Sequence, residues 1–207
     1  MPQSRRSSYH HGDLAPVLMD LAVREIEEKG SEKLSLRSLA RRAGVSQAAP
    51  YHHFSTKADL LAAVATRGFE ELAQRLQEAV AGSSELEGQL LEMGTAYVEF
   101  AVQNPVVFDL MFGRTTEDFS QQHEMVRAAN ECLEVLLDLV ARIVAERGRQ
   151  EDQKTLAGVF WSAAHGVAAL QTRMGPTAQA ERATGVTEAI SKDIRAALQI
   201  LIGNLFG

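Results

Sequence analysis

The sequence predicts an all-α protein, and three observations support this. Apolar residues recur at intervals of three and four along most of the 207 residues, which is the spacing of one face of an α-helix. No segment has the alternation of apolar and polar β-branched residues that is typical of a strand. Glycines, prolines and short polar clusters separate the periodic segments. Together these patterns predict about nine helices.

The first four helices are predicted from stripes and caps. The first runs from about Leu14 to Lys29 and ends at Gly30, a suitable residue for the left-handed position that follows a helix. Two short helices follow within residues 35–54. Thr56 is expected to cap a fourth helix, which runs from Lys57 to about Ala81 and is long enough to link two domains.

Five more helices are predicted in the remainder of the chain. Pro105 suits the first turn of the second of these, which is short and almost wholly apolar up to Gly113. The last two are rich in alanine and glycine, and the final one carries a continuous aliphatic stripe. The expected ranges are about 85–102, 105–112, 119–147, 152–173 and 184–206.

The two short helices within residues 35–54 have the outline of a helix-turn-helix. Gly44 stands where the first would end in the left-handed region, and Ser46 is expected to cap the second. That second helix is predicted to be about two turns long, with Pro50 in its first turn, and is short enough to enter a major groove. An ordinary helical hairpin fits the same pattern.

Charge favours the DNA-binding interpretation. Residues 1–57 carry nine Lys and Arg against six Asp and Glu, whereas the rest carries twelve against twenty-one. The chain total is −6, yet its first quarter is about +3. This asymmetry suggests a small DNA-facing domain on an acidic body.

The motif at residues 34–46, Leu-Ser-Leu-Arg-Ser-Leu-Ala-Arg-Arg-Ala-Gly-Val-Ser, resembles the N-terminal domain of the TetR family of bacterial transcriptional repressors. Tyr51-His52-His53-Phe54 and the following Ser-Thr-Lys-Ala-Asp-Leu-Leu continue the likeness. Upstream, residues 9–14, Tyr-His-His-Gly-Asp-Leu, resemble the entry to the first helix in part of that family.

The C-terminal half resembles the Trp-His-Gly type of TetR C-terminal domain. The likeness rests on Asn104-Pro105 through Phe112-Gly113 and on Trp161 with His165-Gly166. It implies a DNA-binding domain at residues 1–57, a linking helix at 57–81, and a C-terminal ligand-binding and dimerisation domain at 82–207.

The resemblance also implies DNA-contacting residues. Arg37 and Lys57 match positions that contact phosphates, and Gln47 presents a donor and an acceptor suited to an adenine edge. Arg41 and Arg42, later in the same helix as Arg37, either contact DNA or are paired with nearby acids. The expected DNA-binding residues are Arg37, Ser46, Gln47, Ala48, Ala49, Tyr51, His52 and Lys57.

The family resemblance implies a homodimer through the last two helices and an effector cavity among the fifth to eighth helices. A monomeric bundle is the alternative to the dimer. Large or adaptable side chains suited to an apolar effector are the expected lining, although each also fits a plain core. These candidates are Met93, Tyr97, Phe100, Phe108, Met111, Phe112, Met125, Trp161 and His165.

Other classes of function have little support. The chain contains no nucleophile elbow, phosphate-binding loop or zinc-protease motif, so we expect no enzyme and no cofactor. Neighbouring histidines at 10–11 and 52–53 point apart on a helix, and no metal is expected. The uncharged residues 155–172 suit a buried helix better than a membrane span, and with Cys132 as the only cysteine, a cytoplasmic protein is expected.

The sequence thus predicts a ligand-inducible repressor that binds a palindromic operator as a homodimer. The rival hypothesis is a helical ligand-binding or scaffold protein that does not bind DNA. The sequence identifies neither the effector nor the operator.

Overall fold

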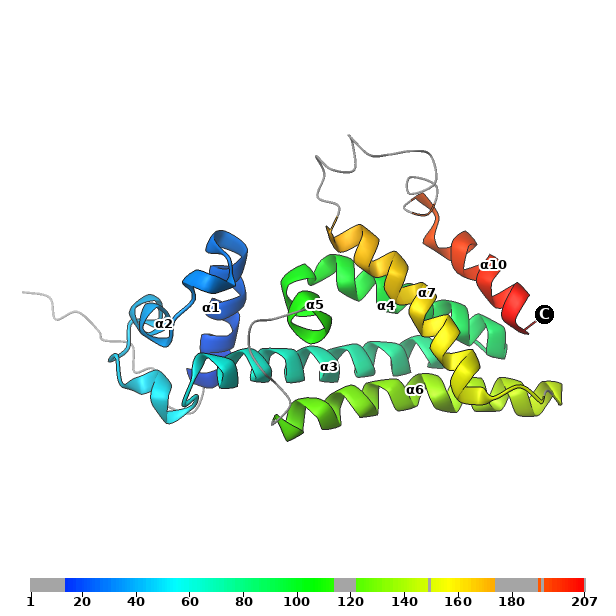
Figure 1. The fold of residues 1–207 in the computed structure, drawn as a ribbon, viewed down its shortest axis with the longest axis horizontal. Helices are drawn as coiled ribbons and strands as arrows, with labels where there is room; N and C mark the ends of the chain where they lie inside the picture. The colour runs from blue at the N-terminus through cyan, green and yellow to red at the C-terminus, as the bar shows by residue number, and fades with distance from the viewer. Residues whose placement is uncertain (1–13, 114–121, 149, 174–189, 191, 207) are drawn as a thin grey trace, which may run out of the picture. The chain divides into compact units, whose positions relative to one another are not determined.

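The computed structural model describes residues 14–113, 122–148, 150–173, 190 and 192–206 (Figure 1). Within these residues it is all-helical, with eight α-helices and two short 3-10 helices. The elements are α1 (Leu14–Lys29), η1 (Ser31–Lys33), α2 (Leu36–Ala43), η2 (Ala49–His52), α3 (Lys57–Ala81), α4 (Leu86–Gln103), α5 (Pro105–Phe112), α6 (His123–Arg147), α7 (Gln153–Arg173) and α10 (Ile194–Phe206).

The chain forms two compact units, and the division falls inside α3, between Val64 and Ala65. The N-terminal unit contains α1, α2 and η2, and the second unit contains α4 to α10. The sequence placed the boundaries at residues 57 and 82, on either side of this point. Assignment of DNA binding to one unit and ligand binding to the other stays a prediction.

In the N-terminal unit, α2 is closed at both ends by local hydrogen bonds. The Ser35 hydroxyl accepts from the Ser38 N–H at 3.1 Å, and the Ser38 hydroxyl accepts from the Ser35 N–H at 3.2 Å. At the other end Gly44 has φ 71°, and Val45 N–H donates to the Ala40 carbonyl at 3.0 Å. This is the Schellman arrangement, so the predicted role of Gly44 is confirmed.

The start of α3 is fixed in the same way. Thr56 Oγ1 accepts from the Asp59 N–H at 3.1 Å, while Asp59 Oδ2 accepts from the Thr56 N–H at 2.9 Å. The predicted cap at Thr56 is therefore confirmed, and an aspartate completes it.

The second helix of the predicted helix-turn-helix differs from the prediction. It is the four-residue 3-10 helix η2 after a turn at Gln47 and Ala48, rather than an α-helix of two turns. Pro50 has no N–H to donate, and Ala49 and Tyr51 donate to carbonyls three residues back, at 3.0 and 3.1 Å. Ser46 accepts through its carbonyl, and η2 has no side-chain cap, so the predicted Ser46 hydroxyl cap was wrong.

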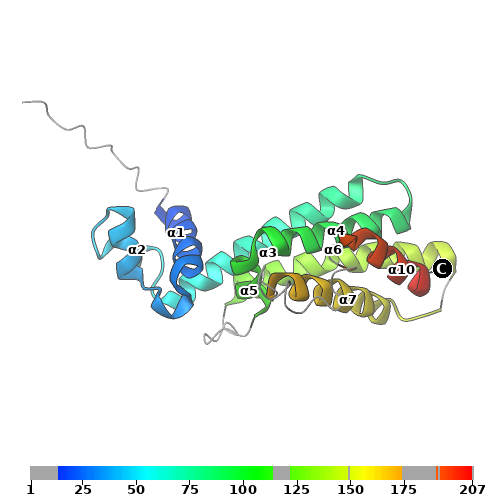
Figure 2. The same ribbon diagram turned by 90° about the horizontal axis from the view of Figure 1, so that it is seen from above.

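In the second unit, α4 is the central helix. It packs against α5, α6, α7 and α10, and Figure 2 shows the same bundle from above. Gly94 permits close contacts with two of these helices, because a Cβ there would lie 2.9 Å from Phe160 of α7 and 3.0 Å from Leu198 of α10.

The C-terminal helices match their predicted ranges within a few residues. Those expected at 85–102, 105–112 and 152–173 are observed as α4, α5 and α7. The predicted helix 119–147 corresponds to α6, and its first residues lie outside the described part of the chain. For the last helix, α10 covers the second half of the predicted 184–206, and residues 184–189 lie outside. The motif at residues 9–13 also lies outside.

None of the described helices combines the length and the apolar character that crossing a membrane would require. The uncharged segment 155–172 belongs to α7, where Leu156, Phe160, Ala164 and Ala168 are buried in the unit's own core.

Two helical glycines provide a test of the packing. Gly68 of α3 faces α5, and a Cβ there would lie 2.6 Å from Val107 Cγ1 and 2.7 Å from Met111 Sδ. We expect Gly68→Ala to lower the free energy of unfolding by about 1–3 kcal/mol through overpacking. At Gly158 of α7 a Cβ meets nothing within 4 Å, so Gly158→Ala is the control and should gain up to about 1 kcal/mol of helix propensity. Urea denaturation measures both, and equal effects would contradict the close contact.

Candidate functional site

The turn and 3-10 helix of the N-terminal unit present polar side chains to solvent. Ser46, Gln47, Ala48, Tyr51 and His52 are exposed, and 47% of the Tyr51 surface is accessible. Ala49 is half-buried. The segment predicted to read DNA therefore offers hydroxyl, amide, phenol and imidazole groups on one short stretch of chain.

The same segment is anchored by two apolar residues. Pro50 and Phe54 are buried, and the Phe54 N–H donates to the Pro50 carbonyl at 2.9 Å. Leu39 and Ala40 of α2 are fully buried in the core of the same unit. Because Pro50 and Phe54 are held in the core, the neighbouring side chains of the turn face outward.

Arg37 and Lys57 stand at the starts of helices. Arg37 is the second residue of α2 and is exposed, and Lys57 is the first residue of α3 and is half-buried. The N-terminus of a helix carries a partial positive charge and exposes N–H groups, so both positions suit a phosphate.

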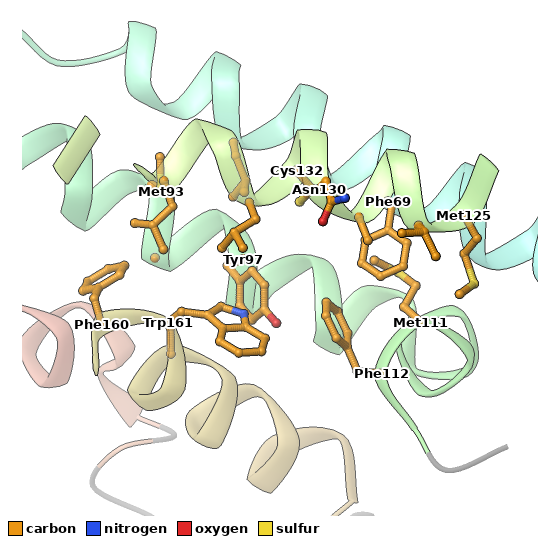
Figure 3. Close-up of a pocket in the computed structure, with 17 residues that line it drawn as sticks. Phe69, Met93, Tyr97, Met111, Phe112, Met125, Asn130, Cys132, Phe160 and Trp161 are labelled. Atoms are coloured by element: carbon orange, nitrogen blue, oxygen red, sulfur yellow. The ribbon is translucent and has the colours of Figure 1, made fainter. Parts of the chain in front are cut away.

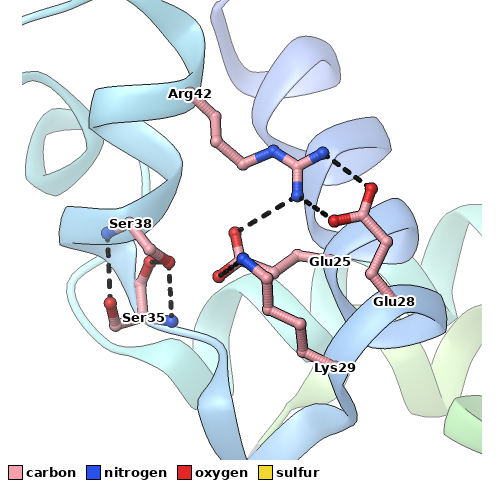
Figure 4. Close-up of polar contacts among 6 residues, drawn as sticks. All are labelled: Glu25, Glu28, Lys29, Ser35, Ser38 and Arg42. Carbon is pink, nitrogen blue, oxygen red and sulfur yellow. Dashed lines mark hydrogen bonds and ion pairs between the residues drawn. The ribbon is translucent and has the colours of Figure 1, made fainter.

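Arg42 belongs to a polar cluster that joins α2 to α1 (Figure 4). Its guanidinium donates to the two carboxylate oxygens of Glu28 at 2.8 and 3.0 Å. A carboxylate oxygen of Glu25 lies 3.9 Å from Arg42 Nη1, and the other lies 4.0 Å from Lys29 Nζ. Of the two arginines left open by the sequence, Arg42 is thus paired with acids within its own unit.

Glu25 is the unusual member of this cluster because it is only 1% exposed. Its Oε2 has no hydrogen-bond partner, so the Arg42 guanidinium and the Lys29 ammonium, each about 4 Å away, supply the electrostatic compensation. For Glu28, the hydrogen bond from Arg42 holds the carboxyl pKa below its usual 4.5. A depressed pKa contributes stability that is present above the unfolded value and is lost as the pH falls through the folded value.

The second unit contains an apolar cavity of about 350 Å³ (Figure 3). Residues of α3, α4, α5, α6 and α7 line it, so it lies among the predicted helices and also reaches α3. Its floor is deeply buried, since Met93 and Phe160 are each 2% exposed and Tyr97 is 6% exposed.

The rim of the cavity is accessible. Val126 and Leu133 of α6 are 44% and 42% exposed, and Trp161 of α7 is 37% exposed. Asn130 stands between the two α6 residues on the same face and is also exposed. In Figure 3 the side chains of Asn130 and Trp161 both extend toward the space between α6 and α7. The cavity is therefore a cleft with a buried apolar floor and a solvent-exposed rim.

The structure brings together six of the nine predicted ligand residues. The six in the cavity wall are Met93, Tyr97, Met111, Phe112, Met125 and Trp161. Phe108 and His165 line a much smaller neighbouring cavity, of about 30 Å³, together with Phe112. Phe100 is fully buried and lies outside the wall, with the Arg75 guanidinium 5.4 Å from its ring centroid.

Several lining residues were missed by the sequence analysis. Phe69 and Leu76 lie on α3, which the sequence analysis treats only as a linking helix, and Cys132 and Phe160 are not among its ligand candidates. Both α3 residues follow the helical stripe, which signals burial without indicating a cavity. Phe160, a large aromatic residue next to Trp161, is the missed residue that the sequence could most easily have indicated as part of the cavity wall.

A hydrogen bond connects the two cavities. The Tyr97 hydroxyl and His165 Nδ1 are 2.8 Å apart, and the His165 ring stacks on Phe108 with centroids 5.3 Å apart. Burial raises the pKa of the Tyr97 hydroxyl, which therefore stays protonated. Burial also raises the pKa of the Cys132 thiol to about 12, so that the cavity wall is uncharged at neutral pH.

Metal binding has no support in the described ranges, where no group of three or more His, Cys, Asp or Glu could hold an ion. Of the paired histidines, His52 and His53 lie in the described part of the chain, and His10 and His11 lie outside it.

An N-terminal helix-turn-helix with an exposed polar turn, followed by a helical unit with a cleft, defines the class of helix-turn-helix transcriptional regulators. Residues 18–64 match the model described as bacterial regulatory proteins, tetR family. Residues 90–194, half of the chain, match the model described as tetracyclin repressor-like, C-terminal domain. The protein belongs to the TetR family, whose members are regulators rather than enzymes.

Individual relatives agree with this assignment. The HTH-type transcriptional activator FasR of Mycolicibacterium smegmatis is 27% identical over 116 residues, which are 56% of this chain and 53% of FasR. The chain thus matches about half the length of that relative. The uncharacterized HTH-type transcriptional regulator YobS of Bacillus subtilis is 24% identical over 91% of this chain and 92% of its own length.

Solved structures show the same fold. A protein of unknown function from Rhodococcus sp. RHA1 superposes with a TM-score of 0.80 and 29% identity, covering 98% of this chain and 100% of that protein. The fatty acid degradation regulator FadR from Bacillus halodurans has a TM-score of 0.69 at 16% identity, covering 95% and 96%. The Trp-His-Gly type of C-terminal domain stays a prediction.

The Arg42 cluster leads to a test against a neighbouring arginine. We expect Arg42→Ala to lower the free energy of unfolding, because it leaves the buried Glu25 carboxylate without its guanidinium neighbour. Arg41→Ala, at an exposed position of the same helix, is the control and should change stability little. Since the Glu28 pKa is depressed, the deficit of Arg42→Ala should shrink as the pH falls below about 4.5. A deficit that is equal in both variants, or that does not change with pH, would contradict the proposed role of the cluster.

Proposed function

We propose that this protein is a ligand-inducible transcriptional repressor of the cytoplasm that binds a palindromic operator as a homodimer. The observation that carries the DNA-binding part is the exposed turn from Ser46 to His52, held outward by the buried Pro50 and Phe54. The proposed DNA-binding residues are those predicted from the sequence, with Arg37 and Lys57 on phosphates and the turn at the base edges.

Two helical faces support the homodimer. The outward face of α7 carries Val159, Ser162, Gly166 and Leu170, which are exposed and spaced by three and four residues. On α10, Ile200 is 68% exposed, the largest value among the exposed large apolar side chains of the described residues. A second copy packed on these residues would cover the exposed apolar side chains, and the small Ser162 and Gly166 would permit its close approach. Leu198, also on α10, is not part of this exposed face, because its side chain packs on Gly94 within its own chain.

The cavity supports a response to a small molecule. Its volume is at the small end of the range for ligand sites, and its wall combines aromatic rings and methionines with few polar groups. An effector alters operator affinity only if it binds the DNA-competent and DNA-incompetent states with different affinities. We propose α3 as the connection, since it supplies Lys57 at its start and Phe69 and Leu76 to the cavity.

Repression rather than activation is part of this proposal and rests on the family resemblance. The relative FasR is named as an activator, so the sign of regulation needs a direct measurement. Footprinting on the DNA that flanks the protein's own gene, followed by transcription from that template, identifies the operator and the sign together.

DNA binding is tested with two variants, one that removes a proposed contact to a base edge and one that removes a proposed contact to a phosphate. Gln47→Ala should lose about 1–3 kcal/mol of binding free energy, mostly on the preferred operator, because it removes a contact to a base edge. Arg37→Ala should weaken binding to all duplexes and reduce the salt slope by about one, because it removes a phosphate contact. Arg142→Ala, which removes an exposed arginine of α6, is the control. A wild-type protein without salt-dependent duplex binding would refute the proposal.

The homodimer is tested on α10. Ile200→Asp would bury an unpaired carboxylate twice in a two-fold interface, and we expect the dimer dissociation constant to rise at least about a hundredfold. The adjacent exposed Gln199→Asp adds the same charge outside the apolar face and should leave assembly nearly unchanged. Sedimentation velocity at micromolar concentration separates the two species. Wild-type protein that sediments as a monomer, or equal shifts in both variants, would contradict the interface.

A further inference from the structure

We propose that the effector is an uncharged amphiphile, with an apolar chain buried against the floor of the cavity and a neutral polar group at the rim beside Asn130. The inference rests on the proposed function of this cavity as the effector site and adds the chemical class of the effector. Three features of the wall support it: the composition of the floor, the charges of the lining and the groups at the rim.

The floor of the cavity offers little to a polar ligand. Met93, Phe160 and Ala164 are each 2% exposed and present only thioether, ring and methyl surfaces. The Tyr97 hydroxyl is already hydrogen-bonded to His165 at 2.8 Å, and the Cys132 thiol stays protonated because burial raises its pKa. A polar group placed at this depth would lose its water without gaining an equivalent partner, so an apolar chain fits best.

The lining carries no formal charge at any described position. Of the 17 residues that line the cavity, none is Asp, Glu, Lys, Arg or His. A ligand carboxylate or ammonium inside the cleft would therefore have no counterion in its wall, and transfer of an unpaired charge from water is strongly unfavourable. The electrostatics of the wall select against both anionic and cationic ligands.

At the rim, α6 supplies one neutral amide group, that of Asn130. Asn130 is exposed beside the apolar Val126 and Leu133, and its amide both donates and accepts. One turn earlier on α6, Arg127 is held by Glu124 at 2.8 Å and by Glu131 at 2.6 Å, and none of the three lines the cavity. A head group at the rim thus meets an amide, while the nearest guanidinium on this helix is already bound by two carboxylates.

Matched ligands of equal chain length test the charge selectivity. The chain contains a single tryptophan, Trp161, which lies in the cavity wall, so its fluorescence reports occupancy. We expect 1-decanol to change Trp161 emission saturably, with a dissociation constant at least about tenfold below those of decanoate and decyltrimethylammonium at pH 8. Equal or tighter binding of either ion would overturn the inference, and so would the absence of a saturable change with all three ligands.

A charge introduced at the rim tests the orientation of the ligand. Asn130→Lys places an ammonium where we locate the head group, and at low salt decanoate affinity should rise about fivefold or more, whereas decanol affinity should change little. Gln153→Lys adds the same charge at an exposed position of α7 away from the cavity and is the control. An unchanged ratio of decanoate to decanol affinity in Asn130→Lys would overturn the placement at Asn130.

Operator binding measured in parallel separates this inference from the proposed function. If decanoate binds best and also lowers operator affinity, the regulatory function stands and the neutral class is wrong. If decanol binds selectively and leaves operator affinity unchanged at fixed salt, the selectivity stands and the ligand response is wrong.

Discussion

The contact of three helices at Gly94 is the constraint on which the second unit depends. Because residue 94 has no side chain, Phe160 of α7 and Leu198 of α10 reach the backbone of α4. Phe160 then forms part of the cavity floor, and Leu198 fixes α10 with Ile200 directed to solvent. A larger residue at position 94 would meet the side chains of both Phe160 and Leu198, so the cleft and the proposed dimer face share one packing contact.

The N-terminal unit depends on an electrostatic contact of a different kind. Its core residues are apolar, yet Glu25 is buried among them and faces Arg42. Burial of a carboxylate is unfavourable unless a cation stays near, so the Arg42 guanidinium is committed to α1 through Glu25 and Glu28. Arg41 and Arg42 are therefore adjacent in the sequence but differ in their surroundings, since only Arg42 faces these two carboxylates. The contact joins α2 to α1 and so supports the helix that precedes the turn proposed to bind DNA.

The sequence predicted the helices well because their ends are determined locally. Thr56, Gly44 and Pro105 act through hydrogen bonds or dihedral angles within a few residues, and all three stand where expected. The cavity wall was predicted less well, since helical periodicity shows that a residue is buried but not what it faces. Phe100 and Phe160 are both buried aromatics on inward stripes, yet of the two only Phe160 lines the cleft. The geometry of η2 was not predicted, because Pro50 is compatible both with the first turn of an α-helix and with a 3-10 helix.

Opposite faces of α7 serve the two proposed interactions of the second unit. Phe160 and Ala164 line the cleft, while Val159, Ser162 and Gly166 face outward. If the outward face is shared between two copies, each α7 is held on both sides, and a ligand that shifts it must also strain the contact with the partner chain. Occupancy of the cleft and assembly then belong to one equilibrium, and each must change the free energy of the other by the same amount. Close packing at the Gly94 contact would help to carry such a shift from α7 to α4 and α10, because tightly packed side chains leave little free space to absorb it.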